Sequence, residues 1–244
     1  MARHLTVITG ASRGMGLAIA QQLLDAGHEL LCISRKVNPA LDGRCEQWPQ
    51  DLARPATAAA RLETWLQAKA GVAWESVTLV NNAALLTRVA SLGHIPLQEL
   101  EDGIRVDLEA PLLLTSAFLR ATESWKAQRK VLNISSGLGR RAMASQALYC
   151  AAKAGMDHFT RCVALEEAQR PNGAKVCSLA PGVIDTDMQV QLRASDPKDF
   201  PDIGYFTGIK EQGVLATPED AARRVIAYLA RTDFGANPAG DIRD

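Results

Sequence analysis

Short apolar runs alternate with helix-like stretches along almost the whole chain, and this alternation constrains the fold more than any other feature. Buried strands of a parallel sheet form continuous apolar runs, as in Leu5–Ile8, and each is followed by a crossover helix. The sequence therefore predicts an α/β fold: a doubly wound, Rossmann-type parallel sheet with helices on both faces. The strand-like runs are Leu5–Thr9, Glu29–Ser34, Ser76–Val80, Lys130–Ile134 and Ala174–Leu179, and the helix-like stretches are Gly14–Ala26, Pro55–Ala70, Ile104–Ala121, Ser145–Gln169 and Thr217–Arg231.

Two segments interrupt this rhythm. Only residues 35–43 separate the second strand from a predicted third strand at Arg44–Trp48, so we expect that crossover to contain no more than a helical turn. Residues 185–216 contain several prolines and glycines, and long irregular segments in compact domains are often functional. We therefore expect one domain, residues 1–244, with a substrate lid at residues 186–214. The lid residues could equally pack the segment onto the body of the protein.

Composition excludes several classes of protein. The 27 basic and 27 acidic residues give a formal net charge of zero, which argues against binding to nucleic acid or to a membrane. No apolar run approaches the roughly 18 residues of a membrane span, and the N-terminus lacks a signal-peptide pattern. The five cysteines and four histidines form no metal-ligand motif. We expect a cytoplasmic protein without a metal.

A glycine-rich turn follows the first strand-like run and leads into the first helix. Its glycines have the spacing GxxxGxG, at Gly10, Gly14 and Gly16. Such a turn brings the backbone close to a pyrophosphate, which then lies at the helix N-terminus. Glycines are common in turns, so the position after a strand and before a helix is the stronger argument. The other predicted cofactor contacts in this turn are Ser12, Arg13 and Met15.

The residues after the second strand indicate which dinucleotide would bind. An acidic residue there would accept hydrogen bonds from the adenosine ribose, whereas an arginine would pair with a 2′-phosphate. The chain has Ser34-Arg35-Lys36, and Arg13 supplies another cation from the glycine-rich turn. Arginine binds phosphate through a bidentate fork. The sequence therefore favours NADP(H) over NAD(H), although Arg13 and Arg35 could instead be solvated surface charges.

The motif Tyr149-Cys-Ala-Ala-Lys153 places a phenol and an ammonium on one helix face. At about 4 Å and an effective dielectric near 20, the ammonium would contribute roughly 4 kcal/mol, which lowers the phenol pKa by about three units. The phenol would then suit general acid–base catalysis. Ser136, at the end of the fifth strand, could hydrogen-bond a carbonyl oxygen. Alone, the Tyr–Lys pair could be surface chemistry, and Ser136 a turn residue.

These features together resemble the short-chain dehydrogenase/reductase family over essentially the whole chain. The motifs that carry the resemblance are Thr9–Gly16, Asp51-Leu52, Asn81-Asn82-Ala83-Ala84, the set Ser136/Tyr149/Lys153, and Pro181-Gly182-Val183-Ile184-Asp185-Thr186. The resemblance implies that Asp51 and Leu52 contact adenine, and that Asn82 with Ala83 lines the adenosine side of the groove. It implies that Ile184 and Thr186, in the motif that begins Pro181-Gly182, hold the nicotinamide carboxamide. Tyr149 and Lys153 would also contact the nicotinamide ribose region.

Within this family the chain is similar to the branch that includes sepiapterin reductase and bacterial reductases of vicinal diketones. The branch implies a small-molecule carbonyl substrate that accepts hydride from NADPH. Besides Ser136 and Tyr149, the substrate would contact Leu138, Met143 and Met188. Family members usually assemble through two long helices, so a homodimer or homotetramer is expected, through residues 104–121 and 145–170.

The chain departs from the family pattern at Asp107, where an asparagine is usual. That asparagine is thought to hold a water that relays protons to the lysine. An ionised Asp107 would stabilise the Lys153 ammonium but oppose ionisation of Tyr149. We expect Asp107 to hold the relay water. We expect little effect from Ala84, where glycine is usual.

Two other functions remain open at this point. The chain could be an NADP-binding sensor or scaffold without turnover, although the intact Ser136, Tyr149 and Lys153 argue against it. It could also be an NAD-dependent alcohol dehydrogenase that works in the oxidative direction.

Overall fold

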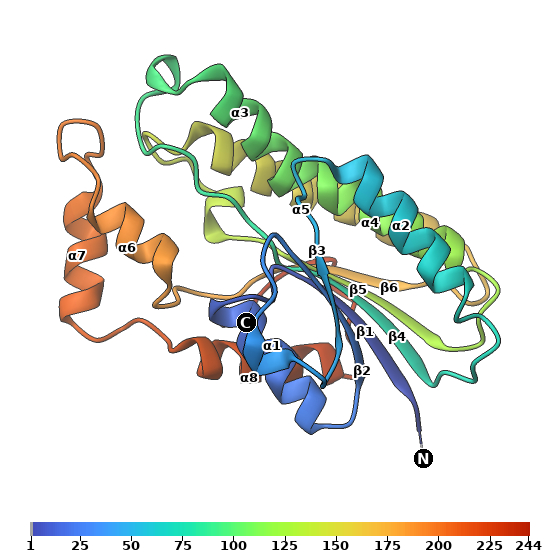
Figure 1. Ribbon diagram of the computed structural model, residues 1–244. Coiled ribbons are helices and arrows are strands. Elements are labelled where there is room, and N and C mark those ends of the chain that lie inside the picture. The colour runs from blue at the N-terminus through green and yellow to red at the C-terminus, as the bar shows by residue number, and fades with distance from the viewer. Residues whose placement is uncertain (1) are drawn as a thin grey trace.

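The computed structural model describes residues 2–244, and its centre is one seven-stranded sheet of order β3-β2-β1-β4-β5-β6-β7 (Figure 1). Every neighbouring pair of strands is parallel. The order reverses between β1 and β4, which is the point where open α/β sheets bind ligands beyond their carboxyl ends. The predicted Rossmann-type architecture is confirmed. The strands are β1 (His4–Thr9), β2 (Glu29–Ser34), β3 (Glu46–Pro49), β4 (Ser76–Asn81), β5 (Gln128–Ile134), β6 (Lys175–Ala180) and β7 (Ala239–Asp241).

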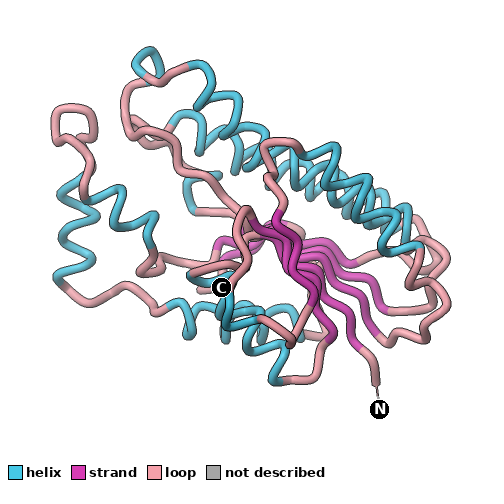
Figure 2. Tube along the Cα trace, in the orientation of Figure 1, coloured by secondary structure: helices cyan, strands magenta, loops and turns pink. Residues whose placement is uncertain are grey.

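Helices cover both faces of the sheet (Figure 2). On one face, side chains such as Leu5 and Val7 pack under α2 and α4, and on the other Ile8 packs under α1 and α8. Alternating strand residues therefore belong to two separate apolar cores, as expected for a sheet buried on both sides. The helices are α1 (Gly14–Asp25), α2 (Pro55–Gln67), α3 (Leu97–Ile104), α4 (Ala110–Ala121), α5 (Ala147–Ala168), α6 (Asp187–Arg193), α7 (Ile203–Glu211) and α8 (Pro218–Ala230).

The helix predicted at Ile104–Ala121 is part of a longer, irregular one. Helix α3 begins at Leu97, a π-helical segment follows at Arg105–Glu109, and α4 continues to Ala121. Pro111 explains the irregularity because it has no N–H for the carbonyl four residues earlier and its ring crowds that carbonyl. The carbonyl in question belongs to Asp107. Single π-turns of this kind are frequent at functional sites.

The secondary structure differs from the sequence prediction at three other places. The third strand begins at Glu46 rather than Arg44, after the expected single helical turn at Pro39–Leu41. The short strand β7 was not predicted, because three residues carry too little pattern. Residues 186–214 were expected to be irregular but contain α6 and α7. These helices cover a small separate core that includes Phe200 and Phe206.

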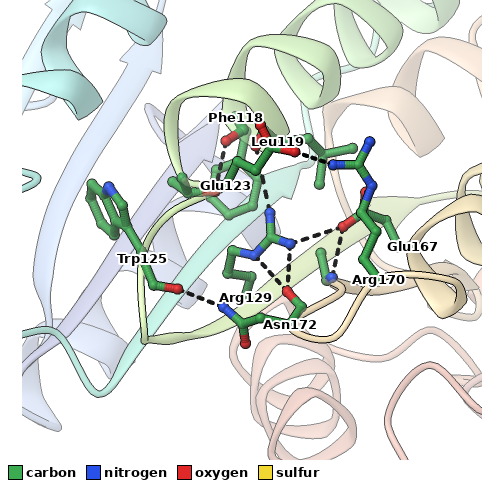
Figure 3. A network of polar contacts seen from close by, with 10 residues as sticks. Phe118, Leu119, Glu123, Trp125, Arg129, Glu167, Arg170 and Asn172 are labelled. Carbon is green, nitrogen blue, oxygen red and sulfur yellow. Dashed lines mark hydrogen bonds and ion pairs between the residues drawn. The ribbon is translucent and has the colours of Figure 1, made fainter.

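A buried ion pair joins α5 to β5 at the edge of the sheet opposite the carboxyl ends of the strands (Figure 3). Arg129 and Glu167 are 3.1 Å apart, and both side chains are almost fully buried. Arg129 also donates to the carbonyl oxygens of Asn172 and Leu119, while Glu167 accepts from the N–H of Ala174. Every polar group of the pair is thus satisfied, so we interpret this cluster as a structural clamp.

Among residues 2–244 there is no helix with the length and apolarity needed to cross a membrane.

Candidate active site

One cleft of about 1350 Å³ opens at the carboxyl ends of the strands, and nearly all the predicted site residues line it. Asp107 and Met143 are the two exceptions. Asp107 lies buried behind the cleft, and Met143 packs against the small core beneath the lid segment, so its substrate contact stays a prediction. The predicted residues along the cleft are Gly10, Ser12, Arg13, Gly14, Met15, Gly16, Ser34, Arg35, Asp51, Leu52, Asn82, Ala83, Ser136, Leu138, Tyr149, Lys153, Pro181, Gly182, Ile184, Thr186 and Met188.

The glycine-rich turn has no room for side chains at two of its positions. A Cβ on Gly16 would lie 2.3 Å from the carbonyl oxygen of Gly10, and a Cβ on Gly10 would lie 2.8 Å from the backbone of Ala83. The side-chain amide of Asn82 donates to the carbonyl oxygens of Thr9 and Gly10. Asn82 therefore holds the turn in place, a contact that the resemblance did not specify.

The N-terminus of α1 is suited to an anion. Its N-cap residue, Arg13, makes no side-chain capping hydrogen bond, and the first turn contains no acidic residue. The first N–H groups of a helix have no partner within the helix, and the helix dipole adds positive potential there. These features fit the pyrophosphate of a dinucleotide. Gly14, at φ +55°, adopts the left-handed backbone that this turn requires.

Two cations, Arg13 and Arg35, were predicted to meet a phosphate, and their surroundings differ. Arg13 forms an ion pair of 2.6 Å with Asp187 at the start of α6, so its guanidinium is already engaged. Arg35 and Lys36 are exposed at the cleft, and no ion pair within residues 2–244 involves either side chain. The unpaired positive charge after β2 is therefore supplied by Arg35 and Lys36.

The structure brings Ser136, Tyr149 and Lys153 together in the cleft but does not support the expected effect of the lysine. Lys153 Nζ lies 5.6 Å from the centroid of the Tyr149 ring and donates to the carbonyl oxygen of Ile134 at 2.9 Å. Burial raises the pKa of Tyr149, the carboxylate of Asp107 raises it further, and the Ser136 hydroxyl lowers it. The pKa of Tyr149 thus lies above its ordinary value, in the direction opposite to the prediction, because burial and the Asp107 carboxylate both raise it.

Asp107 is the buried carboxylate behind this group of residues. The π-helical segment at Arg105–Glu109 turns this side chain inward, where the residue is 1% exposed. Its carboxylate accepts a hydrogen bond from the N–H of Leu85 at 2.7 Å. Burial raises its pKa to about 6, against the opposing effect of the Lys153 ammonium. Burial lowers the pKa of Lys153, and the carboxylates of Asp107 and Asp157 oppose this. Asp107 therefore carries most of its charge at neutral pH and helps to keep Lys153 protonated.

The other end of the cleft is largely apolar and lies under the lid segment. Leu86, Leu138 and Met188 line it together with Tyr205 and Phe206 of α7. The sequence predicted a lid at residues 186–214, but it did not single out Gln146, which also lines this end. Its place three residues before Tyr149, on the same side of the helix start, was the signal that could have found it.

The loop before α5 is fastened to the lid segment. Ser145 has φ +62°, a backbone conformation that non-glycine residues rarely adopt, and its hydroxyl donates to the carbonyl oxygen of Asp199. Gln191 of α6 donates to the carbonyl oxygens of Leu86 and Thr87 on the opposite wall. Residues 186–214 are therefore held over the cleft at both sides.

The comparison with protein families matches a short chain dehydrogenase model to residues 4–197. This chain belongs to the short-chain dehydrogenase/reductase family. Its members are oxidoreductases, which agrees with the Ser136, Tyr149 and Lys153 side chains in the cleft. The family expectation from the sequence is confirmed.

Two curated relatives share a name. The chain is 33% identical to benzil reductase ((S)-benzoin forming) of Bacillus cereus, over 97% of this chain and 96% of the relative. It is 34% identical to the protein of the same name from Bacillus subtilis (strain 168), over 93% and 94%. Among solved structures, the KRED1-Pglu enzyme is similar with a TM-score of 0.83 and 27% identity, over 97% of this chain and 99% of that one.

Solved structures of this fold contain either dinucleotide. A 3-oxoacyl-[acyl-carrier protein] reductase from Brucella melitensis, with a TM-score of 0.80, 22% identity and coverage of 99% and 96%, is a complex with NAD. A metagenomic short-chain oxidoreductase, with a TM-score of 0.71, 28% identity and coverage of 94% and 92%, is a complex with NADP. The fold therefore accepts both, and the choice depends on the residues around the adenosine ribose.

Replacement of Asp107 by asparagine should change the pH dependence of this oxidoreductase. The carboxylate raises the pKa of Tyr149, so its removal should lower that pKa and move the alkaline limb of kcat/KM for reduction to lower pH. A transition near pH 6, where Asp107 itself titrates, should disappear. Initial rates between pH 5 and about 10 measure both changes.

Asp102→Asn is the matched control, because Asp102 also lines the cleft but is partly exposed and paired with Arg105. Its charge is screened by solvent, so the profile should stay in place. An Asp107→Asn profile identical to that of the parent protein would show that the carboxylate does not act on Tyr149. The expected water relay can be tested with Asp107→Ala, since unchanged turnover in that variant would contradict it.

Proposed function

We propose that this protein is an NADPH-dependent carbonyl reductase that reduces one carbonyl group of a vicinal, aromatic diketone, as in the conversion of benzil to benzoin. The observation that carries the proposal is the convergence of Ser136, Tyr149 and Lys153 on one cleft that also contains the glycine-rich turn. Two relatives named benzil reductase, at 33–34% identity over almost the full length of this chain, support the substrate class. The apolar end of the cleft suits a bulky, uncharged compound.

In this proposal the side chains bind and polarise the carbonyl group. A nicotinamide cofactor supplies the hydride when it is bound in the cleft. The carbonyl oxygen accepts hydrogen bonds from the hydroxyl groups of Ser136 and Tyr149, which stabilise the negative charge that develops there. The Tyr149 phenol is protonated at neutral pH, so it can donate a proton to that oxygen. Lys153, held by the carbonyl oxygen of Ile134, supplies positive charge beside the phenol.

The choice of NADPH follows from the two unpaired cations after β2. A 2′-phosphate would meet Arg35 and Lys36, and no acidic residue stands there to bind an unmodified ribose. We expect NADPH to raise the unfolding temperature more than NADH at equal concentration, because a ligand stabilises in proportion to the logarithm of its concentration over Kd. The double variant Arg35→Ser/Lys36→Ser should raise the KM for NADPH about 10- to 100-fold, since hydrogen bonds to charged groups are lost, and leave that for NADH little changed.

Lys175→Ser is the control for the loss of positive charge, because Lys175 is an exposed cation at the first residue of β6. A larger thermal shift with NADH than with NADPH would reverse the cofactor assignment and favour the NAD-dependent dehydrogenase.

NADPH consumption across a set of carbonyl compounds tests the substrate class. Benzil and other aromatic diketones should be reduced faster than simple aldehydes, with sepiapterin as a comparison from the related branch. Nucleotide binding without turnover of any compound would favour the alternative of a sensor or scaffold.

A further inference from the structure

Gln146 lines the cleft, and its side-chain amide has no hydrogen-bond partner among the described residues. It is 4% exposed, and no hydrogen bond within residues 2–244 involves its side-chain nitrogen or oxygen. Residues 2–244 contain three other buried residues with side-chain amides. Asn81 and Asn133 bond each other and two threonines, and Gln189 accepts from Arg193. Within residues 2–244 the buried side-chain atoms without a partner belong to Ser34, Asn81 and Trp125, so the unpaired amide of Gln146 reaches the open cleft and can bond a ligand there.

The position of Gln146 points to a ligand in the cleft. The residue precedes the first residue of α5, and its side chain lines the cleft together with Ser136 and Tyr149. Its backbone is engaged, since the N–H donates to Met143 and the carbonyl accepts from Cys150. The backbone at Gln146 is therefore fixed, while the donor and the acceptor of its side-chain amide are free. Residues three apart at a helix start have Cβ atoms about 5–6 Å apart, so Gln146 and Tyr149 can bind one small molecule.

We propose that Gln146 donates a hydrogen bond to the second carbonyl oxygen of a vicinal diketone while Ser136 and Tyr149 hold the first. This inference rests on the proposed function. The two oxygens of such a compound are on adjacent carbons, so donors on neighbouring parts of one cleft can reach both. The neighbouring Leu138, Met188 and Phe206 supply no donor, and the other donors of the cleft include Arg141, Gln189, Tyr205 and Arg243. A monoketone leaves the amide unpaired, and a site built to bond a polar group discriminates against compounds that lack it.

The test compares benzil with deoxybenzoin, which has the same two rings but one carbonyl group. The variant Gln146→Met keeps the length of the side chain and removes its polar atoms. The ratio of kcat/KM for benzil to that for deoxybenzoin should fall about tenfold in this variant, as expected for one lost hydrogen bond. The unfolding temperature of the free protein should stay equal or rise, because no partner within the protein is lost.

Gln67→Met is the matched control, since Gln67 is exposed at the end of α2 and outside the cleft. Its ratio should equal that of the parent protein. Gln146→Asn, whose amide is one methylene shorter, should lower the ratio as Gln146→Met does and covers the case that the methionine variant does not fold.

The outcomes separate this inference from the proposed function. If the parent protein reduces neither ketone, the proposed function fails. If it reduces benzil and the ratio is unchanged in both Gln146 variants, the role of Gln146 is overturned while the function stands. A lower unfolding temperature with an unchanged ratio would assign Gln146 a structural role instead.

Discussion

Replacement of Tyr149 by phenylalanine is expected to reduce NADPH-dependent turnover by about 10²- to 10⁴-fold, the usual contribution of a general acid. The ring would remain in the cleft, but the substrate oxygen would lose both a hydrogen bond and its proton donor. The phenol has a raised pKa and is protonated at neutral pH, so its proton is available in the parent protein. Steady-state rates with benzil, at saturating cofactor, measure the loss in kcat.

Cofactor binding serves as the internal control for this variant. The glycine-rich turn and the N-terminus of α1 are untouched, so the thermal shift on addition of NADPH should largely persist. Tyr205→Phe is the matched control, since it makes the same substitution at another tyrosine that lines the cleft. Tyr205 is half exposed on α7 and donates no hydrogen bond among the described residues. Turnover in Tyr149→Phe close to that of the parent protein would remove the basis for assigning a reductase mechanism.

The sheet was predictable because each strand leaves a strong local signal. Continuous apolar runs between helix-like stretches specify parallel strands, and five of the seven strands in the structure follow from them. The third strand was also predicted, although Arg44–Trp48 is not an apolar run. Helices α6 and α7 were missed because they are short and lie among prolines and glycines, and only tertiary packing around Phe200 makes them regular. The π-helical segment before α4 was missed for a similar reason, because it depends on how Pro111 crowds the preceding turn of the helix.

The site was predictable as a set of residues but not as an electrostatic environment. Spacing along the chain places Tyr149 and Lys153 on one helix face, but it contains no information on burial. The direction of the Tyr149 pKa depends on burial and on Asp107, which approaches from a different element. For the same reason Arg13 could not be recognised as the partner of Asp187, 174 residues away. The homodimer or homotetramer and the cytoplasmic location stay predictions.

The second large effect concerns stability, at the structural clamp of Figure 3. We expect Arg129→Met to lower the free energy of unfolding by about 3–5 kcal/mol, because Glu167 is left as a buried charge without its main partner. The carbonyl oxygens of Asn172 and Leu119 also lose a donor. Urea denaturation followed by circular dichroism measures the change, and the midpoint of thermal unfolding should fall by roughly 10 °C.

Two further variants test whether the buried charge causes this loss. Arg170→Met removes a half-exposed guanidinium that pairs with Glu123 and Glu167, and should cost no more than about 1 kcal/mol because solvent screens it. The double variant Arg129→Met/Glu167→Met removes both buried charges and should recover part of the stability lost in Arg129→Met alone. A double variant less stable than Arg129→Met would show that the hydrogen bonds to Asn172 and Ala174, rather than the balance of charge, hold α5 to the sheet.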